Sequence, residues 1–434
     1  MNILVVGSGG REHALCWALR RGREGSRRSV FCAPGNAGIA AEAQCVPVDP
    51  TDLAALADFA ERENIDLTVA GSEAPLAAGL ADEFAARGLL VAGPPRRAAR
   101  LESSKVFSKE FMIRHGVPTA RHRVAESIEE ARAILSGGEF GGEDSPVVIK
   151  ADGLAAGKGV VVARTRAEAV RAASEMSGGT LVGREAGSRL VIEEALEGRE
   201  ASLLLWTDGR DYALMPAARD HKRVGDGDTG PNTGGMGAIT APGVLDDETL
   251  GRVVREMVEP TLAGAEADGL GFRGVLFVGL MLTAEGPRVL EYNVRFGDPE
   301  AQAILVRFRG DLAAVFESVA RGRLREAEIA WSEEASACIV LASRGYPERP
   351  ETGAVISGLE EAAGLPSVRL FHAGTRRAAD GSYLTAGGRV LGVTATGPTL
   401  DEALTRGYEA AARVRWDGVH YRRDIGRFAA AEGG

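Results

Sequence analysis

The sequence is short of lysine, and the few lysines present are clustered. Among 51 Lys and Arg residues only five are lysine, and all five lie between residues 105 and 222. A compact ammonium on a flexible stem suits a phosphate oxygen in a confined site, where the planar guanidinium of arginine fits less well. The clustering therefore predicts that this segment holds the anion chemistry. The five are Lys105, Lys109, Lys150, Lys158 and Lys222.

Cysteine is also scarce, and the four cysteines (Cys16, Cys32, Cys45 and Cys338) form no CxxC pair. This spacing argues against a disulfide framework or a zinc site and fits a reducing cytosol. The first residues, MNILVVG, have no basic lead-in of the kind that precedes a secretory signal. Apolar runs stay well short of membrane-spanning length. We therefore expect a cytoplasmic protein that does not act on membranes.

Blocks of basic residues are missing, and the formal net charge is −10. This balance disfavours nucleic acid as a partner. An acidic chain can still bind small anionic substrates through backbone N–H groups and helix N-termini. Histidine is sparse too, with six in the chain, and no Ser/His/Asp or Cys/His constellation can be assembled. Hydrolase and thiol chemistry are therefore disfavoured.

The chain is long enough, at 434 residues, for several domains. Short apolar runs at 3–7, 30–33, 67–71 and 89–93 alternate with helical patterns. Such alternation predicts a parallel sheet with helices on both faces. Ligands of such sheets bind at the carboxyl ends of the strands.

Three polar loops follow these predicted strands. GSGGREHA (7–14) opens a helix, but Glu12 occupies the third glycine position of a GxGxxG fingerprint, so a dinucleotide site is disfavoured. The glycines and the helix N-terminus suit a single phosphate, with a tight turn that binds nothing as the alternative. PGNAG (34–38) and GSEAPL (71–76) reach the same edge of the sheet. We expect a substrate site there.

The segment ADGLAAGKGVVV (151–162) resembles a Walker A loop only superficially. Its spacing is one residue short of GxxxxGK, Gly159 stands where Ser or Thr is needed, and a strand follows. The flanking runs PVVIK (146–150) and GVVVA (159–163) instead predict a hairpin flap. Its backbone N–H groups, with Lys150 and Lys158, suit closure over phosphates; a purely structural turn is the alternative.

The segment LEYNVRFGD (290–298) is the candidate metal strand. Alternation along a strand places Glu291, Asn293 and Arg295 on one face, with Tyr292 and Val294 on the buried face. A carboxylate and an amide oxygen are hard donors that suit magnesium bridging ATP phosphates. The arginine could neutralise charge on a phosphoryl group or a carboxylate. A solvated polar face is the alternative.

The segment DHKRVGDGDTGPNTGGMGA (220–238) combines acids, bases, amides and six glycines, and we interpret it as a long loop. A loop of this polarity is costly unless it binds a ligand. It could offer N–H groups to a carboxylate and carboxylates to an amine. A disordered surface linker is the alternative.

Together these segments resemble the phosphoribosylamine–glycine ligase family, also called glycinamide ribonucleotide synthetases, of the ATP-grasp superfamily. The resemblance spans essentially the whole chain. It is carried, in family order, by GGREHA, APGNAG, ESSKVFSKEF, IKADGLAAGKGV, the 220–238 segment, EYNVRFGDPE, FHAGT and GGRVL.

The resemblance implies a multidomain α/β and α+β fold. It implies a Rossmann-like N-terminal substrate domain at 1–103, an ATP-grasp domain at 104–325 with a glycine-rich flap subdomain at about 122–192, and a small C-terminal α/β domain at 326–426. A monomer is the favoured state, with a dimer as the alternative.

The activity implied by the resemblance is an ATP-dependent ligation. Glycine would be joined to 5-phospho-D-ribosylamine through glycyl phosphate, giving glycinamide ribonucleotide, ADP and phosphate in de novo purine biosynthesis. The implied cofactor is Mg²⁺, with Mn²⁺ as a substitute, and the partners are small molecules only. An acyl phosphate hydrolyses in water, which explains a closing flap. Phosphoryl transfer depends on positioning and charge neutralisation, which lysines, a metal and an arginine supply.

The resemblance also implies individual roles. The catalytic residues would be Arg295, Lys158, Asp220 and Lys222. ATP contacts would be Lys105, Lys150, Gly157, Glu193, Glu194, Ala195, Leu196 and Glu200. Substrate contacts would be Gly9, Gly10, Arg11, Asn36, Gly38, Glu73, Asn232, Thr233, Gly235, Met236 and Asp298. The metal ligands would be Glu291 and Asn293.

The sequence departs from the family pattern in three places. Ser72 stands where proline is usual, the loop at 136–146 is longer, and the run VLFVGLML lacks the extra carboxylate found in many ATP-grasp enzymes. A ligand set for a second metal is therefore not visible in the sequence.

Three other interpretations compete. An ATP-grasp ligase with other substrates is disfavoured by the 220–238 segment. A nucleotide-binding regulatory protein without catalysis is disfavoured by intact Lys150, Glu291, Asn293 and Arg295. A nicotinamide oxidoreductase is disfavoured by Glu12.

Overall fold

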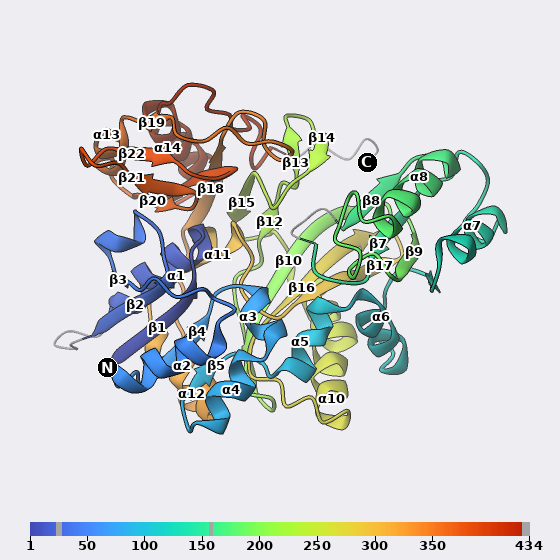
Figure 1. The fold of residues 1–434 in the computed structure, drawn as a ribbon, viewed down its shortest axis with the longest axis horizontal. Coiled ribbons are helices and arrows are strands. Elements are labelled where there is room, and N and C mark those ends of the chain that lie inside the picture. The colour runs from blue at the N-terminus through green and yellow to red at the C-terminus, as the bar shows by residue number, and fades with distance from the viewer. Residues whose placement is uncertain (23–27, 156–158, 428–434) are drawn as a thin grey trace.

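The computed structural model describes residues 1–22, 28–155 and 159–427. Its N-terminal part is a five-stranded sheet of order β3-β2-β1-β4-β5 (Figure 1), in which every paired strand is parallel. The alternation seen in the sequence therefore predicted this sheet correctly. The strands are β1 (Asn2–Gly7), β2 (Ser29–Pro34), β3 (Gln44–Cys45), β4 (Leu67–Ala70) and β5 (Val91–Ala92). The accompanying helices are α1 (Gly10–Arg20), η1 (Ile39–Ala41), α2 (Leu53–Arg62), α3 (Glu73–Ala78) and α4 (Leu80–Ala86).

Two helices lead from this sheet toward the centre of the molecule. They are α5 (Arg96–Ser103) and α6 (Lys105–Arg114), and they meet at Ser104. Ser104 has extended backbone, and its hydroxyl accepts a hydrogen bond from the Phe107 amide at 3.1 Å, so it caps α6. The cap fixes Lys105 as the first residue of the helix.

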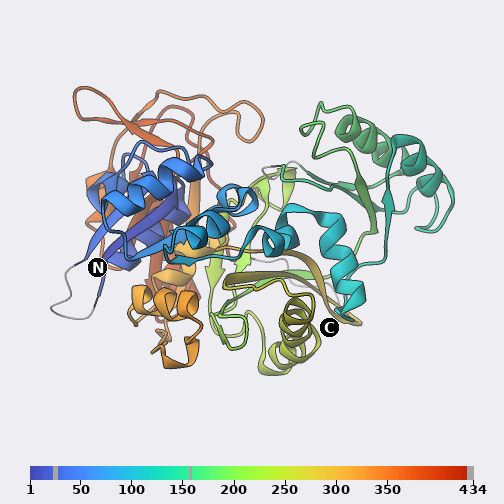
Figure 2. The same ribbon diagram turned by 60° about the horizontal axis from the view of Figure 1, so that its bottom comes forward.

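A four-stranded sheet of order β6-β9-β7-β8 forms a separate lobe, shown at the right of Figure 2. Its elements are β6 (His122–Ala125), α7 (Ile128–Ser136), β7 (Val147–Ala151), β8 (Val160–Ala163), α8 (Arg166–Ser177) and β9 (Leu190–Glu194). Strands β7 and β8 pair antiparallel, with Lys150 opposite Val160, as the hairpin prediction requires. The lobe has its own hydrophobic core, which includes Ile149 and Ile192.

The central sheet is antiparallel, of order β11-β10-β16-β17. Its strands are β10 (Arg199–Thr207), β11 (Tyr212–Leu214), β16 (Gly274–Thr283) and β17 (Gly286–Asn293). The helical elements around it are α9 (Asp247–Val253), the π-helical turn η2 (Val254–Val258), α10 (Glu259–Ala267), α11 (Glu300–Leu305), α12 (Leu312–Arg321) and η3 (Leu324–Glu326). Val278, Leu280 and Tyr292 of this sheet are fully buried.

The 220–238 segment is not the irregular loop that its composition suggested. It contains β13 (Arg223–Gly225) and β14 (Thr229–Asn232), which form a hairpin, and it is bounded by β12 (Arg219–Asp220) and β15 (Gly237–Thr240). Strand β15 pairs with β18 (Ala335–Ala342). The interpretation as a loop is therefore wrong, because β12 to β14 are short and mostly polar, and β15 completes its pairing only with β18, about a hundred residues away.

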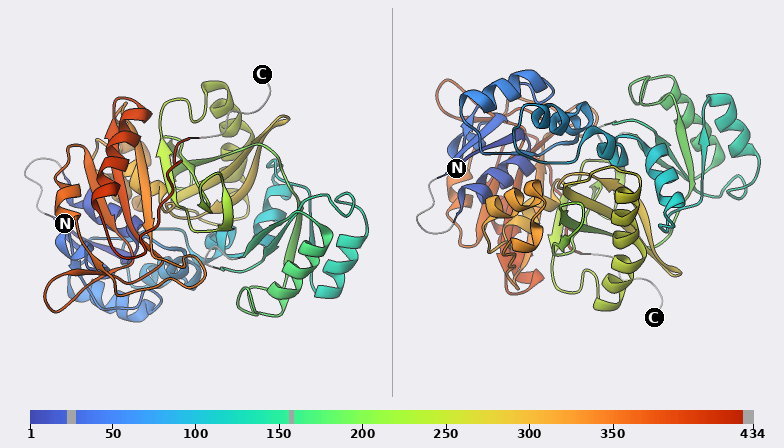
Figure 3. Two further views of the ribbon diagram at one scale, coloured as in Figure 1. Left: turned by 90° about the horizontal axis from the view of Figure 1, so that it is seen from above. Right: turned by 90° about the horizontal axis from the view of Figure 1, so that it is seen from below.

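The C-terminal part is built on the sheet β12-β15-β18-β23-β20. Its remaining elements are β19 (Val355–Ile356), α13 (Leu359–Ala363), β20 (Val368–His372), β21 (Thr375–Arg377), β22 (Tyr383–Thr385), β23 (Arg389–Gly397) and α14 (Leu400–Arg413). Figure 3 shows these elements against the N-terminal sheet, on the side away from the β6–β9 lobe. The backbone amide of His372 donates to His13 Nδ1 at 2.8 Å, which joins the two parts. Within residues 1–22, 28–155 and 159–427, no helix is both long and apolar enough to cross a membrane.

Candidate active site

A cleft of about 720 Å³ lies where these parts meet, and its lining comes from every one of them. The volume is that of a small-molecule site. Most residues singled out from the sequence line this cleft. They are Arg11, Glu73, Lys105, Lys150, Glu193, Glu194, Ala195, Leu196, Glu200, Asp220, Lys222, Asn232, Thr233, Glu291, Asn293, Arg295 and Asp298.

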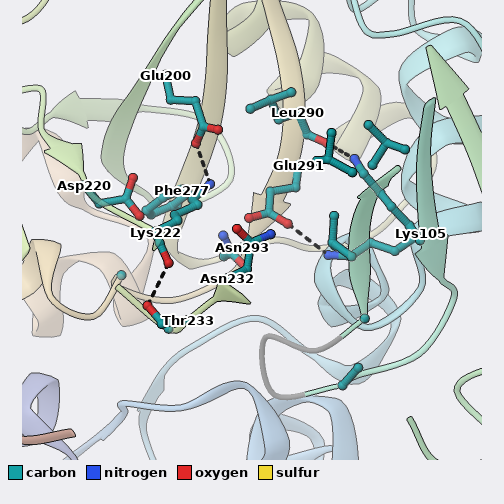
Figure 4. A pocket seen from close by; sticks show the side chains of 18 of the residues that line it. Lys105, Glu200, Asp220, Lys222, Asn232, Thr233, Phe277, Leu290, Glu291 and Asn293 are labelled. Carbon is teal, nitrogen blue, oxygen red and sulfur yellow. Dashed lines mark hydrogen bonds and ion pairs between the residues drawn. The ribbon is translucent and has the colours of Figure 1, made fainter. Parts of the chain in front are cut away.

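Strand β17 carries the two candidate metal ligands into the cleft (Figure 4). Glu291 and Asn293 line the cleft, whereas Tyr292 and Val294 are buried on the other side, as strand alternation predicts. The Tyr292 hydroxyl lies 2.5 Å from Thr261 Oγ1, which anchors the buried face. The cleft face of this strand is therefore held in a fixed register.

The carboxylate of Glu291 is surrounded by lysines. Lys105 Nζ lies 3.3 Å from Glu291 Oε2. Burial on its own would raise the pKa of Glu291, but Lys105, Lys222 and Lys150 outweigh it and hold that pKa well below its ordinary value. The group therefore stays ionised at any working pH.

The donor set fits a divalent metal held jointly with phosphates. An ionised carboxylate and an amide oxygen are hard donors, and Mg²⁺ typically takes one or two protein carboxylates plus waters and phosphate oxygens. Among the residues that the structure describes, no group of three or more His, Cys, Asp and Glu side chains is placed to hold a metal. Glu291 and Asn293 would therefore supply only part of the coordination shell.

The strand β7 lysine links the β6–β9 lobe to β17. Lys150 Nζ lies 2.9 Å from Glu193 Oε2 and donates to the Leu290 carbonyl at 3.0 Å. Glu193 is the fourth residue of β9, and the chain leaves that strand after Glu194 and runs along the cleft through Ala195 and Leu196. The Arg121 guanidinium and backbone amide both hold the Glu194 carboxylate, at 2.7 and 2.8 Å.

A second charged group lies in the cleft near Glu291. Lys222 Nζ lies 2.9 Å from Glu200 Oε2. Figure 4 marks this ion pair with a dashed line. Burial would lower the pKa of Lys222, but Glu200, Asp220 and Glu291 outweigh it and raise that pKa well above its ordinary value. Burial raises the pKa of Asp220 to about 8, against the opposing charge of Lys222. The cluster offers a fixed cation beside carboxylates, which suits a zwitterionic substrate.

Arg295 follows β17 and is held by two glutamates. Its guanidinium lies 2.6 Å from Glu102 Oε1 and 3.2 Å from Glu73 Oε2. The other oxygen of Glu102 accepts the Val294 amide at 2.8 Å, so one buried carboxylate fixes both the strand end and the arginine. Burial would raise the pKa of Glu73, but Arg295 and Arg11 outweigh it and lower that pKa to about 2.

The first glycine loop explains why the dinucleotide fingerprint fails. The Glu12 side chain fills the space left by three glycines. A Cβ on Gly7, Gly9 or Gly71 would lie within 2.4–2.8 Å of it. One Glu12 oxygen accepts the Gly9 amide at 2.5 Å, and the other lies 2.7 Å from Arg11 Nε. The Glu12 carboxylate therefore occupies the N-terminus of α1, which is the position where a GxGxxG loop would bind a pyrophosphate.

Some predicted substrate contacts do not line the cleft among the described residues. They are Gly9, Gly10, Asn36, Gly38, Gly235 and Met236. The Asn36 carboxamide bonds the Ser8 and His372 carbonyls and accepts two backbone amides. Met236 is fully buried. Gly157 and Lys158 lie outside the described residues, so their predicted roles stay predictions.

Sequence reasoning assigned no role to several cleft residues, including Glu102, Glu300, Tyr346 and Arg389. Arg389 belongs to β23, and its guanidinium reaches the Asp298 carboxylate at 3.1 Å and the Gly234 carbonyl at 2.5 Å. Glu102 and Arg389 stand inside the motifs ESSK and GGRVL, which is the only signal the sequence offered. Their partners are too distant in the chain for spacing to reveal.

Comparison with known proteins covers nearly the whole chain. The family models described as phosphoribosylglycinamide synthetase match it through their N domain (residues 1–102), ATP-grasp (A) domain (103–301) and C domain (336–428). A phosphoribosylamine–glycine ligase from Xylella fastidiosa is 48% identical over 430 residues, covering 98% of this chain and 97% of that protein.

Solved structures agree. The crystal structure of a phosphoribosylamine–glycine ligase from Thermotoga maritima has a TM-score of 0.82 and 36% identity, covering 98% of this chain and 100% of that one. A biotin carboxylase domain from Hydrogenobacter thermophilus has a TM-score of 0.71 at 19% identity, covering 97% of this chain and 91% of that one, and shares the fold alone. The predicted fold class is confirmed. The chain belongs to the phosphoribosylglycinamide synthetase family.

Proposed function

We propose that the cleft binds ATP with Mg²⁺, glycine and 5-phosphoribosylamine, and that it joins the last two through glycyl phosphate. Membership of the family makes the chain an ATP-dependent ligase that forms glycinamide ribonucleotide in purine biosynthesis. The observation that carries the proposed arrangement is the 3.3 Å contact between Lys105 and Glu291. It places a phosphate-binding cation beside a metal-binding carboxylate.

ATP would lie between the β6–β9 lobe and β17. Lys105 and Lys150 would contact its phosphates, the backbone from Glu193 to Leu196 would read the adenine, and Glu200 would bond the ribose. Mg²⁺, held by Glu291 and Asn293, would neutralise charge on the phosphate oxygens; Mn²⁺ has the same preference for oxygen donors and would substitute. Gly157 and Lys158 would act from the flap.

Glycine would bind beside Lys222 and Arg295. Its carboxylate oxygen attacks the γ-phosphorus of ATP, the bond to the bridging oxygen breaks, and ADP leaves. The two cations neutralise the carboxylate and the acyl phosphate formed from it. The glycine ammonium would bind beside Asp220 and lower the pKa of that carboxyl group from about 8, which favours its ionised form, with Asn232, Thr233 and Gly235 around it.

The amine of phosphoribosylamine then attacks the acyl carbon, phosphate leaves with the C–O bonding electrons, and the nitrogen loses a proton. This substrate would lie toward the N-terminal loops, where Arg11, Glu73 and Asp298 line the cleft. Gly9, Gly10, Asn36, Gly38 and Met236 would shape that end of the site.

We also propose that the chain divides at the boundaries 1–103, 104–325 and 326–426, with a flap subdomain at about 122–192. A separate core in the β6–β9 lobe supports the subdomain. All four cysteines are free, which fits a cytoplasmic enzyme. A monomer is our proposal for its state, and light scattering of the purified protein measures it.

The test is ADP formation by purified protein with ATP, Mg²⁺, glycine and freshly generated phosphoribosylamine, each omitted in turn. ADP that requires all four components, together with glycinamide ribonucleotide, supports the proposal. Trapping of glycyl hydroxamate when hydroxylamine replaces phosphoribosylamine supports the acyl phosphate. ADP formed with another acid or amine instead would overturn the substrate assignment.

A further inference from the structure

One lysine of the five has no place in the proposed chemistry. Lys109 lies on α6, one turn after Lys105, and only 2% of its side chain is exposed. It is not among the described residues that line the cleft. Its ammonium lies 3.1 Å from Glu193 Oε1 and donates to Thr119 Oγ1 at 2.6 Å. Burying an ammonium costs free energy unless the group is paired. Because the chain uses arginine at most other basic positions, a buried lysine here indicates a specific role for this side chain.

Glu193 stands between two lysines. Its Oε2 lies 2.9 Å from Lys150 and its Oε1 lies 3.1 Å from Lys109, and the carboxylate is as buried as Lys109. Burial would raise the pKa of Glu193, but Lys150 and Lys109 outweigh it and lower that pKa. Two cations and one anion leave the triad with a net charge of plus one, which Lys150 presents to the cleft.

The triad is anchored on β17 at two consecutive carbonyls. Thr119, which accepts from Lys109, donates to the Val289 carbonyl at 2.6 Å. Lys150 donates to the next carbonyl, that of Leu290, at 3.0 Å. A lysine ammonium has three donors. Within the described residues Lys150 uses two of them, on Glu193 and on the Leu290 carbonyl, which leaves the third for a phosphate oxygen.

We propose that Lys109 is a positioning residue for nucleotide binding. Its ion pair with Oε1 of Glu193 offsets part of the charge of that carboxylate and keeps Oε1 from accepting a second hydrogen bond from Lys150. The positive charge and the third hydrogen of Lys150 therefore stay available to ATP. This inference rests on the proposed phosphate contact of Lys150. With Lys109 neutral, the triad carries no net charge, and Glu193 can turn both oxygens toward Lys150. The effect is large because the group is shielded from water.

The experiment measures ADP dissociation constants by calorimetry in the presence of Mg²⁺. Lys109→Met and Lys109→Gln are each expected to weaken ADP binding by on the order of tenfold, the scale of one lost charge beside a buried ionic site. The glutamine can still bond Thr119, so it tests the charge even if the methionine variant does not fold. KM values for glycine and phosphoribosylamine are expected to stay within about twofold, because Lys109 acts only through the ATP contact of Lys150. Equal losses for all three substrates would instead indicate general disorder of the site.

The double variant Lys109→Gln/Glu193→Gln separates positioning from packing. It restores a net charge of plus one and is expected to bind ADP more tightly than Lys109→Gln alone. Additive losses in the double variant would overturn the proposal in favour of a purely structural role. Arg114→Met is the matched control, because it removes a cation from the exposed end of the same helix and should leave ADP binding unchanged.

Lys150→Met distinguishes a failure of the proposed phosphate contact of Lys150 from a failure of the proposed role of Lys109. If it binds ADP like the wild type, the phosphate contact of Lys150 is wrong, and the role of Lys109 fails with it. If Lys150→Met loses affinity while both Lys109 variants keep it, only the inference about Lys109 is overturned.

Discussion

Lys105 and Glu291 are 186 positions apart in the sequence, yet the lysine ammonium lies 3.3 Å from the glutamate carboxylate. The pair joins the first turn of α6 to β17. Each charge offsets the other, and both groups line the cleft.

Glu291→Gln tests the metal assignment. It removes a charged donor without changing volume, so we expect kcat to fall by at least about a hundredfold and the Mg²⁺ concentration for half-maximal rate to rise. Unfolding midpoints should shift little, since the side chain is partly exposed. Glu285→Gln, a carboxylate at the exposed turn before the same strand, is the control. A normal rate with an undisturbed Mg²⁺ requirement in Glu291→Gln contradicts the assignment.

Glu102→Gln tests whether one carboxylate holds Arg295 and the end of β17. The amide can satisfy only part of the contacts to the Val294 amide and the Arg295 guanidinium. We expect kcat to fall by about tenfold and stability by about 1–3 kcal/mol, since a buried charged partner is left poorly paired. Steady-state rates and urea midpoints measure both. Unchanged kcat alongside lost stability would confine Glu102 to a structural role.

Gly38→Ala tests the junction between the N-terminal and C-terminal parts. An added Cβ would lie 2.2 Å from Cγ of the His372 ring, which is buried and hydrogen-bonded to Thr375 Oγ1. We expect a loss of stability of about 1–3 kcal/mol by overpacking. Gly183→Ala is the control, because open space surrounds the corresponding position there. Equal unfolding midpoints for the two variants would show that the junction yields easily.

Acid is expected to destabilise the fold through three buried histidines. Burial is the main cause that lowers the pKa of His13 to about 3 and those of His221 and His372 to about 4. The neighbours His372, Arg422 and Arg377, respectively, lower them further. His13 Nδ1 and His221 Nε2 accept backbone amides, so these nitrogens carry no proton in the native state.

The sign of the effect follows from these values. Unfolded histidine binds a proton below a pH of about 6.5, whereas the folded groups do not until about pH 3–4, so the unfolded state takes up more protons in that window. The contribution of these histidines to stability should therefore be constant above about pH 7 and fall toward pH 5, by on the order of 1–2 kcal/mol per histidine. Urea titrations across this range measure it. His221→Gln should flatten the slope.

The local features of the fold were accessible from the sequence, and the long-range ones were not. Runs such as ILVVG and PVVIK predicted strands because their apolar periods and flanking glycines are local signals. The face shared by Glu291 and Asn293 followed from strand geometry alone. The strands β12 to β14 were missed because they are short and built largely of polar residues and glycine, and β15 was missed because the strand it pairs with, β18, lies about a hundred residues away.

The candidate site shows the same division. Motif residues such as Lys105 and Lys150 could be assigned to ATP, but Lys109 could not, because its role depends on Glu193, which is brought near only by the packing of α6 on β9. Arg389 crosses from another part of the molecule to reach Asp298. Burial and neighbouring charges, which set the raised pKa of Asp220, likewise exist only in the folded state.

The pairing of β15 with β18 affects how the chain is made and how it can be divided. During synthesis β15 emerges well before β18, the strand with which it pairs. Until β18 is made, the backbone N–H and C=O groups on that edge of β15 have no strand partner. Cutting the chain between the two strands would leave an unpaired edge on both fragments, a template for aggregation. The halves should therefore be soluble only when they are produced together, which makes this ladder a natural site for a split-protein reporter of assembly.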